Sequence, residues 1–342
     1  MAADLSLAAG AAPGHAAAPG HAAELGHAAA PGHAAELGHA AAPGHAAAPG
    51  HAAALGHAAA PSDALAPDYA VAPEAVQAFQ RDGAVCLRGL FCAGELEAVA
   101  AGVERNLREP SANAKVASRP DDPGFFFQDY CNWQRIPEYR ELIFRSAAAA
   151  AAAQLMSAAT VRLYHDHLLV KEPGTRQRTP WHQDQPYYNI EGRMSVSMWL
   201  PIDPVPRESS LEFIAGSHLG PWRMPRAFLD NEARWFPEGS LAPLPDIESN
   251  RPAYPIIGWA IEPGDAVFFH MLALHGAAGV SGVGRRRVLS VRFMGEDVRH
   301  APRRWKTSPH FPGLAEELPA GAEMAHPLFP VVWARGEATS RA

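Results

Sequence analysis

A mainly β fold with flanking helices is predicted for this chain of 342 residues. Helical periodicity is confined to the first part of the globular sequence, before about residue 157. From residue 160 onward, short segments of alternating polarity are separated by glycine and proline turns, which is the pattern of antiparallel strands. Helices followed by many short strands indicate an antiparallel sandwich or barrel.

Residues 1–66 are predicted to be a disordered tail, and residues 67–342 one domain. The tail repeats a six-residue unit of alanine, glycine and proline, with a histidine at every sixth position from His15 to His57. Its prolines exclude a long helix, and it has almost nothing to bury in a core. Histidines six residues apart do not share a helix face, and in polyproline II they would lie about 19 Å apart. Weak, flexible metal chelation remains an alternative role.

The domain is expected to begin with helices separated by one strand. Pro73 and Gly83 delimit the first helix, because proline is favoured in the first turn and glycine after the last. An alanine run lies inside the last helix, which is predicted to be continuous. The expected elements are a helix within 72–83, a strand over 84–91, a helix over 94–109 and a helix over 138–156.

Residues 121–134 are rich in aromatic side chains and show no clear period. We predict a loop packed over the core. The alternative is a lid over a substrate pocket, with Phe127, Tyr130 and Trp133 as its candidate residues.

Four later segments are predicted as strands: 160–171, 193–202, 264–276 and 285–295. In the first of them, alternation places every second residue from Val161 to Lys171 on one face.

Composition excludes several classes of function. The net charge is −7, and the first 80 residues contain no lysine or arginine, which leaves the remaining chain close to neutral. No nucleic-acid or membrane partner is therefore expected, and no apolar run approaches the ~20 residues that span a bilayer. The N-terminus does not resemble a signal peptide, and three cysteines without a C-x-x-C pair indicate a cytoplasmic protein.

The segment TPWHQDQPYY (179–188) places His182 and Asp184 two residues apart. Side chains two apart in an extended segment project the same way, so both can ligate one ion. Two histidines and one carboxylate on one face of an octahedron leave three positions open for oxygen chemistry.

The third ligand is expected on a distant strand, from His270 or His275 in FFHMLALHG. We favour His275, because it comes at a strand end, just before a glycine, where a ligand can reach a barrel mouth. His165 and His167 form a separate H-x-H pair, an alternative zinc site for which no carboxylate partner is evident.

An oxygen-activating iron site also needs a two-electron donor. 2-Oxoglutarate chelates iron through its keto-acid end, and its distal carboxylate needs a cation, for which the arginine fork is best suited. In GRRRVLSVRF, strand alternation directs Arg286 and Arg292 to one face. Arg286 is a candidate anchor, unless the run 285–287 is a solvated turn. Arg292 is a candidate for a substrate carboxylate or for an internal ion pair.

Together, the H-x-D motif, the F-F-H-x-L-x-x-H-G segment and an arginine eleven residues beyond its second histidine resemble the phytanoyl-CoA dioxygenase family. These proteins are iron(II)- and 2-oxoglutarate-dependent oxygenases. The resemblance covers about residues 75–300, and LEFIAGSH (211–218) also fits it. It implies a double-stranded β-helix, a cupin-like jelly roll closed by helices.

The resemblance also implies roles for individual residues. The expected ligands of Fe²⁺ are His182, Asp184 and His275, and the expected anchor of 2-oxoglutarate is Arg286. Four further residues are expected to line or wall the cosubstrate pocket: Gln183, Trp199, Lys171 and His167.

The implied activity is O₂-dependent hydroxylation of an unactivated C–H bond in a small, apolar or amphipathic molecule, with release of succinate and CO₂. Asp184 favours hydroxylation over halogenation, because related halogenases lack a carboxylate at this position. Two alternatives remain: a non-catalytic metal-binding or sensing protein on the same scaffold, and a zinc hydrolase built on the same ligands. The basic cluster 299–306 is either solvated surface or a site for a phosphate or CoA group.

Overall fold

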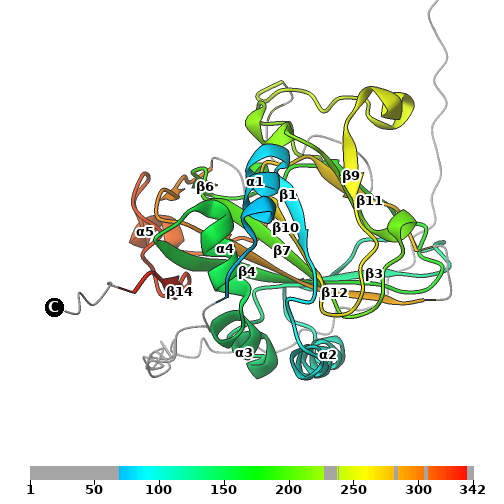
Figure 1. Cartoon of the computed structure of the whole chain (residues 1–342), viewed down its shortest axis with the longest axis horizontal. Coiled ribbons are helices and arrows are strands. Elements are labelled where there is room, and N and C mark those ends of the chain that lie inside the picture. Colours follow the sequence, from blue (N-terminus) through cyan, green and yellow to red (C-terminus); the bar gives the residue numbers. More distant parts are fainter. Residues whose placement is uncertain (1–68, 227–236, 238, 281–283, 304–306, 337–342) are drawn as a thin grey trace, which may run out of the picture. The chain divides into compact units, whose positions relative to one another are not determined.

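The computed structural model describes residues 69–226, 237, 239–280, 284–303 and 307–336 (Figure 1). The histidine repeat and the predicted boundary at residue 66 lie outside the described residues. Within them, helices come first and antiparallel strands follow, so the predicted mainly β fold class is confirmed.

The first three predicted elements are confirmed. Helix α1 (Pro73–Asp82) ends at Gly83, whose φ of 79° lies in the left-handed region that favours glycine. Strand β1 (Ala84–Leu87) is shorter than predicted, and helix α2 (Ala93–Arg108) buries its expected apolar face.

The single helix predicted over 138–156 is wrong, because Ser146 divides it into α3 (Pro137–Arg145) and α4 (Ala148–Met156). The Ser146 hydroxyl donates to the carbonyl oxygen of Leu142 at 2.6 Å and accepts from the N–H of Ala148 at 3.2 Å. A serine that bonds the backbone on both sides competes with the continuous helical ladder. The alanines of α4 are all buried, which is typical of a helix enclosed on every side.

The loop predicted for the aromatic segment is also wrong. Residues Phe126–Tyr130 form strand β3, which pairs with β4 (Thr160–Lys171) inside the large sheet. Four of its five residues are buried, so both faces are covered and no alternation of polarity appears in the sequence.

The strands form three sheets in which the pairings are antiparallel. The large sheet has the order β1-β10-β7-β12-β4-β3-β2, with β14 also paired to β4, and a second sheet has the order β5-β11-β8-β9. Strands β6 and β13 form a short third sheet. The remaining bounds are β2 Lys115–Val116, β5 Thr179–His182, β6 Ile190–Glu191, β7 Ser195–Pro201, β8 Leu211–Ile214, β9 Ile256–Gly258, β10 Ala266–His270, β11 His275–Ala277, β12 Arg286–Met294, β13 Arg299–His300, β14 Val331–Ala334 and a short helix α5 Leu314–Glu317.

Both faces of the large sheet are buried, and each face contributes to a different core. On β12, Leu289, Val291 and Phe293 belong to the core that includes residues of helices α1 to α4, whereas Val288 belongs to the core shared with the second sheet. Figure 1 shows the helices and the strands β9 and β11 on different sides of this sheet. Two packed sheets with helices on one outer face make the predicted helix-flanked jelly roll.

The prediction that every second residue from Val161 to Lys171 shares one face of the strand is wrong, because β4 contains a β-bulge. Arg292 pairs with His165 and the next residue of β12 pairs with Leu163, so Tyr164 has no cross-strand partner. An extra residue reverses the alternation. Val161 and Leu163 consequently pack in the helix-side core, whereas His167 faces the space between the sheets.

Packing between α2 and α3 yields a stability prediction. A Cβ added at Gly102 would lie 2.9 Å from the Cβ of Glu138 and 3.0 Å from Cε1 of Tyr139. Gly102→Val is therefore expected to lower the free energy of unfolding by about 1–3 kcal/mol through overpacking, measured by urea denaturation. Gly94→Val in the same helix meets nothing within 4 Å and is expected to change stability by less than about 0.5 kcal/mol. Equal losses in the two variants would contradict this account of the contact.

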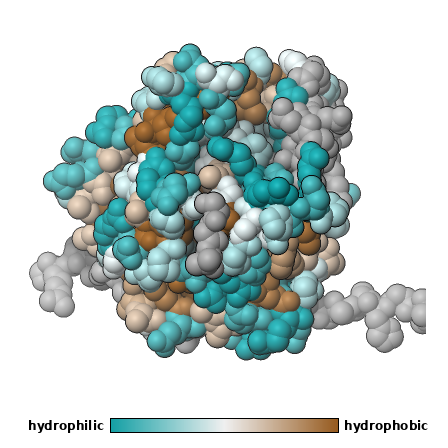
Figure 2. Space-filling model, turned by 90° about the vertical axis from the view of Figure 1, so that its right-hand side faces the viewer, coloured by the Kyte–Doolittle hydropathy of each residue, from teal (hydrophilic) through white to brown (hydrophobic). Residues whose placement is uncertain are grey.

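The described surface has few large exposed apolar side chains. On the face drawn in Figure 2, hydrophobic residues are scattered among hydrophilic ones and form no single broad patch. Among the described helices, none combines the length and apolar character that crossing a membrane requires.

Candidate metal centre

A cavity of about 280 Å³ opens between the large sheet and the second sheet. Its lining includes His182, Asp184 and His275 together with Trp199 and Arg286. The three proposed iron ligands and the proposed anchor Arg286, which come from three separate segments of the sequence, therefore line the same cavity.

The two histidines face each other as a cross-strand pair. His275 opens β11 and lies opposite His182 at the end of β5, with ring centroids 4.1 Å apart. The Nδ1 atom of His182 lies 2.8 Å from the carbonyl oxygen of Pro180, and that of His275 lies 2.9 Å from the carbonyl oxygen of Ala273. A donor hydrogen bond at Nδ1 fixes the tautomer that leaves the Nε2 lone pair for a metal.

Asp184 reaches the same point from a turn. Strand β5 ends at His182, and Asp184 adopts helical dihedral angles at the start of a 3₁₀ turn, Gln185–Tyr187. The N–H groups of Asp184 and Gln185 both donate to the carbonyl oxygen of Met271, at 2.8 and 3.0 Å. The expected convergence of the H-x-D pair therefore arises from this pinned turn and not from alternation along one strand.

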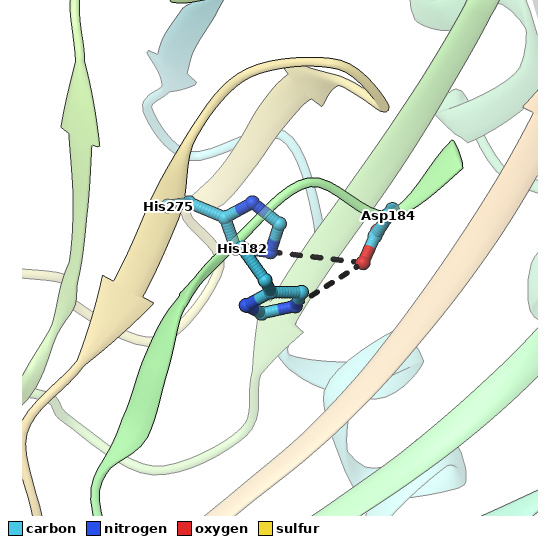
Figure 3. A group of neighbouring side chains, drawn as sticks. All are labelled: His182, Asp184 and His275. Carbon is cyan, nitrogen blue, oxygen red and sulfur yellow. Dashed lines mark ion pairs between the residues drawn. The ribbon is translucent and has the colours of Figure 1, made fainter. Parts of the chain in front are cut away.

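The three donor groups lie close together (Figure 3). Oδ1 of Asp184 is 3.5 Å from Nε2 of His182 and 3.7 Å from Nε2 of His275. Among the described residues, this trio is the one cluster of metal-binding side chains found, with donor atoms within 4.8 Å of one another. The alternative zinc pair, His165 and His167, belongs to no such cluster.

The second carboxylate oxygen of Asp184 is held by two other side chains. Oδ2 accepts from the Ser197 hydroxyl at 2.8 Å and from Nη2 of Arg292 at 3.2 Å. Burial alone would raise the pKa of Asp184, but the charge of Arg292 and the contact with His182 outweigh burial and hold the pKa well below its usual value. Burial lowers the pKa of His275 to about 3, so this ring is neutral at pH 7.

This donor set fits a divalent iron ion. A carboxylate and two imidazoles on one side of an ion form the 2-His-1-carboxylate arrangement of non-haem iron(II) oxygenases. The three donor atoms lie within 4.8 Å of one another, which is close enough for one ion to contact all three. Phe269 packs 4.6 Å from the ring of His275, centroid to centroid, which shields one side of the cluster from water.

His270, the other candidate for the third ligand, uses both of its ring nitrogens in hydrogen bonds to the backbone. Its Nε2 lies 2.8 Å from the carbonyl oxygen of Arg193, and its Nδ1 accepts from the N–H of Leu272 at 3.0 Å. The strand predicted over 264–276 breaks after His270, and the chain crosses to the other sheet before His275. This crossing separates two histidines that are only five residues apart.

Arg286 lies at the other end of the cavity and is 7 % exposed. It donates to the carbonyl oxygen of Ser209, and its guanidinium carbon lies 5.8 Å from the ring centroid of Trp199. Burial lowers its pKa to about 10, so it stays charged at pH 7. Within the described residues no carboxylate forms a salt bridge with it, and a buried cation without such a partner favours an anionic ligand.

Of the four further residues expected at the cosubstrate pocket, Trp199 and His167 line the cavity. Nε2 of His167 lies 3.1 Å from Oε1 of Gln128, and the ring of Tyr130 stacks on it with centroids 4.1 Å apart. Of the three aromatic lid candidates, Tyr130 borders the cavity, whereas Phe127 and Trp133 are buried in the helix-side core.

Gln183 and Lys171 are not among the described residues that line the cavity. The Gln183 amide donates to the carbonyl oxygen of Leu272 at 2.8 Å and accepts from the N–H of Arg223 at 2.7 Å. Lys171 donates to the carbonyl oxygen of Gln177 at 2.8 Å. Both side chains hold backbone segments in place through these hydrogen bonds, and Lys171 also lies directly opposite Arg286 in the pairing of β4 with β12. The cosubstrate contact expected for them stays a prediction.

Two residues that support the ligands were not assigned this role from sequence. Ser197 lies two residues before Trp199 on β7, and Tyr188 accepts from Nε of Arg292 at 3.1 Å. Because Ser197 and Trp199 are two residues apart in the predicted strand 193–202, their shared strand face could have indicated that Ser197 lies near the site. In the basic cluster 299–306, Arg303 pairs with Glu191 at 2.7 Å. Residues 304–306 lie outside the described residues, so a phosphate or CoA site there stays a prediction.

A jelly roll whose two sheets enclose two histidines and one carboxylate defines the class of non-haem iron proteins with a facial ligand triad. The family model described as "Phytanoyl-CoA dioxygenase (PhyH)" matches residues 79–288. The chain belongs to the phytanoyl-CoA dioxygenase family, which confirms the resemblance found in the sequence. Enzymes of this family use Fe(II), 2-oxoglutarate and O₂.

Two curated relatives show the extent of the similarity. A probable phytanoyl-CoA dioxygenase of Caenorhabditis elegans is 24% identical over 192 residues, which cover 55% of this chain and 56% of that protein. The peroxisomal phytanoyl-CoA dioxygenase of Rattus norvegicus is 25% identical over 172 residues, which cover 48% and 49%. The chain thus matches about half the length of these relatives.

Solved structures show the same fold. The non-haem α-ketoglutarate-dependent carbocyclase SnoK from nogalamycin biosynthesis superposes with a TM-score of 0.61 at 24% identity, covering 77% of this chain and 97% of SnoK. EctD from S. alaskensis, solved with 2-oxoglutarate and 5-hydroxyectoine, gives a TM-score of 0.55 at 19% identity, covering 78% and 87%. At these identities the similarity establishes the jelly-roll fold.

Proposed function

We propose that this protein is an Fe(II)- and 2-oxoglutarate-dependent dioxygenase that hydroxylates an unactivated C–H bond of a small, apolar or amphipathic molecule. Succinate and CO₂ are the products of the cosubstrate. The observation that carries the proposal is one cavity bordered by both the His182–Asp184–His275 cluster and the buried cation of Arg286. Family membership supports the same chemistry.

The residues of the chain divide the work between them. His182, Asp184 and His275 would hold the iron, which when bound supplies oxygen activation coupled to decarboxylation of 2-oxoglutarate. Ser197 and Arg292 fix the carboxylate of Asp184 by its second oxygen, so that Oδ1 faces the histidines.

Arg286 would bind the distal carboxylate of 2-oxoglutarate by two parallel N–H bonds, and the Trp199 ring positions its guanidinium. The keto-acid end is then directed at the histidine cluster. The apolar walls around it, which include Leu169, Leu211 and Phe269, exclude water from this part of the cavity.

A non-catalytic metal-binding protein and a zinc hydrolase share the three ligands. A metal store has no need of a buried cation that binds a carboxylate, and a zinc hydrolase would not consume 2-oxoglutarate. The free thiols of Cys86, Cys92 and Cys131 are compatible with the predicted cytoplasmic location, which stays a prediction.

Anaerobic titration tests the proposal. Ferrous iron and then 2-oxoglutarate are added to the purified protein, and the weak visible charge-transfer absorption of iron chelated by a keto acid is recorded. The absorption is expected only when both are present, and admission of O₂ should then release succinate. Folded protein that binds iron but shows neither signal would contradict the oxygenase function and favour the binding protein.

A further inference from the structure

Arg292 occupies the end of the cavity opposite Arg286. The two residues are six positions apart on β12 and lie on the same face, so their Cα atoms are roughly 20 Å apart at about 3.3 Å per residue. Arg286 contacts Ser209, next to the end of β11 where Ala277 pairs with Leu211. Arg292 contacts Asp184 instead. The metal-binding cluster therefore lies between the two arginines.

The guanidinium of Arg292 is only partly used by the protein. Arg292 is 5 % exposed, its Nε donates to the Tyr188 hydroxyl at 3.1 Å and its Nη2 donates to Oδ2 of Asp184 at 3.2 Å. Its Nη1 is buried and has no hydrogen-bond partner among the described residues. A guanidinium offers five N–H donors, and leaving a buried charged donor unpaired is unfavourable.

The charges around the cavity point to one kind of ligand. Three charged side chains of its lining have described surroundings: Arg286 and Arg292 are cationic, and Asp184 is acidic. A ferrous ion and the dianion of 2-oxoglutarate cancel each other in charge. The loaded cavity thus keeps an excess of positive charge, which an anion of the substrate would offset.

We propose that the substrate carries a carboxylate and that Nη1 of Arg292 binds this group. The inference rests on the proposed function and adds a substrate class to it: a small amphipathic carboxylic acid. Arg292 then orients the substrate from the metal side, since the same guanidinium holds Asp184. The bond presented for oxidation lies close to the carboxylate end, while the apolar remainder extends along Tyr130 and Tyr187 toward Val116, which is 60 % exposed.

Direct binding tests the proposal without turnover. Protein loaded with Mn(II) and 2-oxoglutarate is titrated with n-alkanoates and phenylalkanoates of increasing length and with the corresponding amides, and Kd is measured by calorimetry. The acids are expected to bind at least about 10-fold more tightly than their amides, because a charged hydrogen bond is lost in the amide. In Arg292→Gln this preference should vanish, and Arg292→Lys should restore part of it.

Two measurements show whether Arg292 binds the carboxylate of the substrate or that of 2-oxoglutarate. The Kd of 2-oxoglutarate and the Mn(II) affinity are determined for Arg292→Gln and for a matched control, Arg285→Gln, which removes an arginine paired with Glu172 and Glu104 outside the cavity. An unchanged Kd for 2-oxoglutarate with a lost acid preference supports the proposal. A large rise in that Kd with the acid preference intact would assign Arg292 to the cosubstrate and overturn it.

Failure of the proposed function would look different. In that case the parent protein would not bind 2-oxoglutarate in a metal-dependent way at all. If 2-oxoglutarate binds but acids and amides bind equally, or none of them binds, the oxygenase stands and the carboxylate-bearing substrate is wrong.

Discussion

His275→Ala is expected to lose metal binding, with an affinity for ferrous iron or Mn(II) at least about 100-fold below that of the parent. Even changing a residue that only hydrogen-bonds a metal ligand costs about 10–100-fold in affinity. The variant removes one of the three donors that lie within 4.8 Å of one another. Oxygen-dependent succinate release should fall below detection for the same reason. Metal affinity is measured by anaerobic calorimetry, and succinate by chromatography.

His270→Ala is the matched control, because the same substitution is made five residues earlier in the same segment. Its side chain bonds the carbonyl oxygen of Arg193 and the N–H of Leu272. Leaving these groups unpaired is expected to cost about 1–3 kcal/mol of unfolding free energy while metal affinity is retained. Loss of metal from folded His270→Ala, with His275→Ala unaffected, would reverse the choice between the two histidines.

Arg286→Gln is expected to raise the Kd of 2-oxoglutarate by about 100-fold or more, because two charged hydrogen bonds of about 1.5–3 kcal/mol each are weakened or lost. Iron affinity should be unchanged, since Arg286 contacts Ser209 and Trp199 and none of the three proposed ligands. The Kd is measured on Mn(II)-loaded protein, where no turnover occurs. Arg286→Lys should give an intermediate value, because a single ammonium cannot form the two parallel bonds.

Arg285→Gln controls for loss of charge at the start of β12. This arginine pairs with Glu172 and Glu104 near the surface, and exposed ion pairs contribute little. Its Kd for 2-oxoglutarate should stay within about 2-fold of the parent, the change expected from less than ~0.5 kcal/mol. Equal effects of the two substitutions would show that general positive charge, rather than a specific carboxylate fork, attracts the cosubstrate.

Local sequence patterns predicted the elements whose faces differ in polarity. Helices α1 and α2 each bury one stripe of side chains, and a glycine in the left-handed region ends the first, so periodicity and capping suffice to place them. Strand β3 and the break between α3 and α4 were missed. Both are enclosed by neighbours, and a fully buried segment has no polar face for a pattern to reveal.

Sequence patterns alone were enough to identify the candidate ligands and anchor: an H-x-D pair, a second histidine before a glycine and an arginine eleven residues further on. These residues have specific donor atoms and spacing, so they are recognisable without coordinates. Tertiary structure alone decided how they meet. Long-range backbone pairing sets three local features: the crossing of the chain between His270 and His275, the turn at Asp184 that is hydrogen-bonded to Met271, and the bulge at Tyr164. Such pairing depends on segments far apart in the chain, so no local pattern encodes it, and the unpaired Nη1 of Arg292 became visible only once those segments were in place.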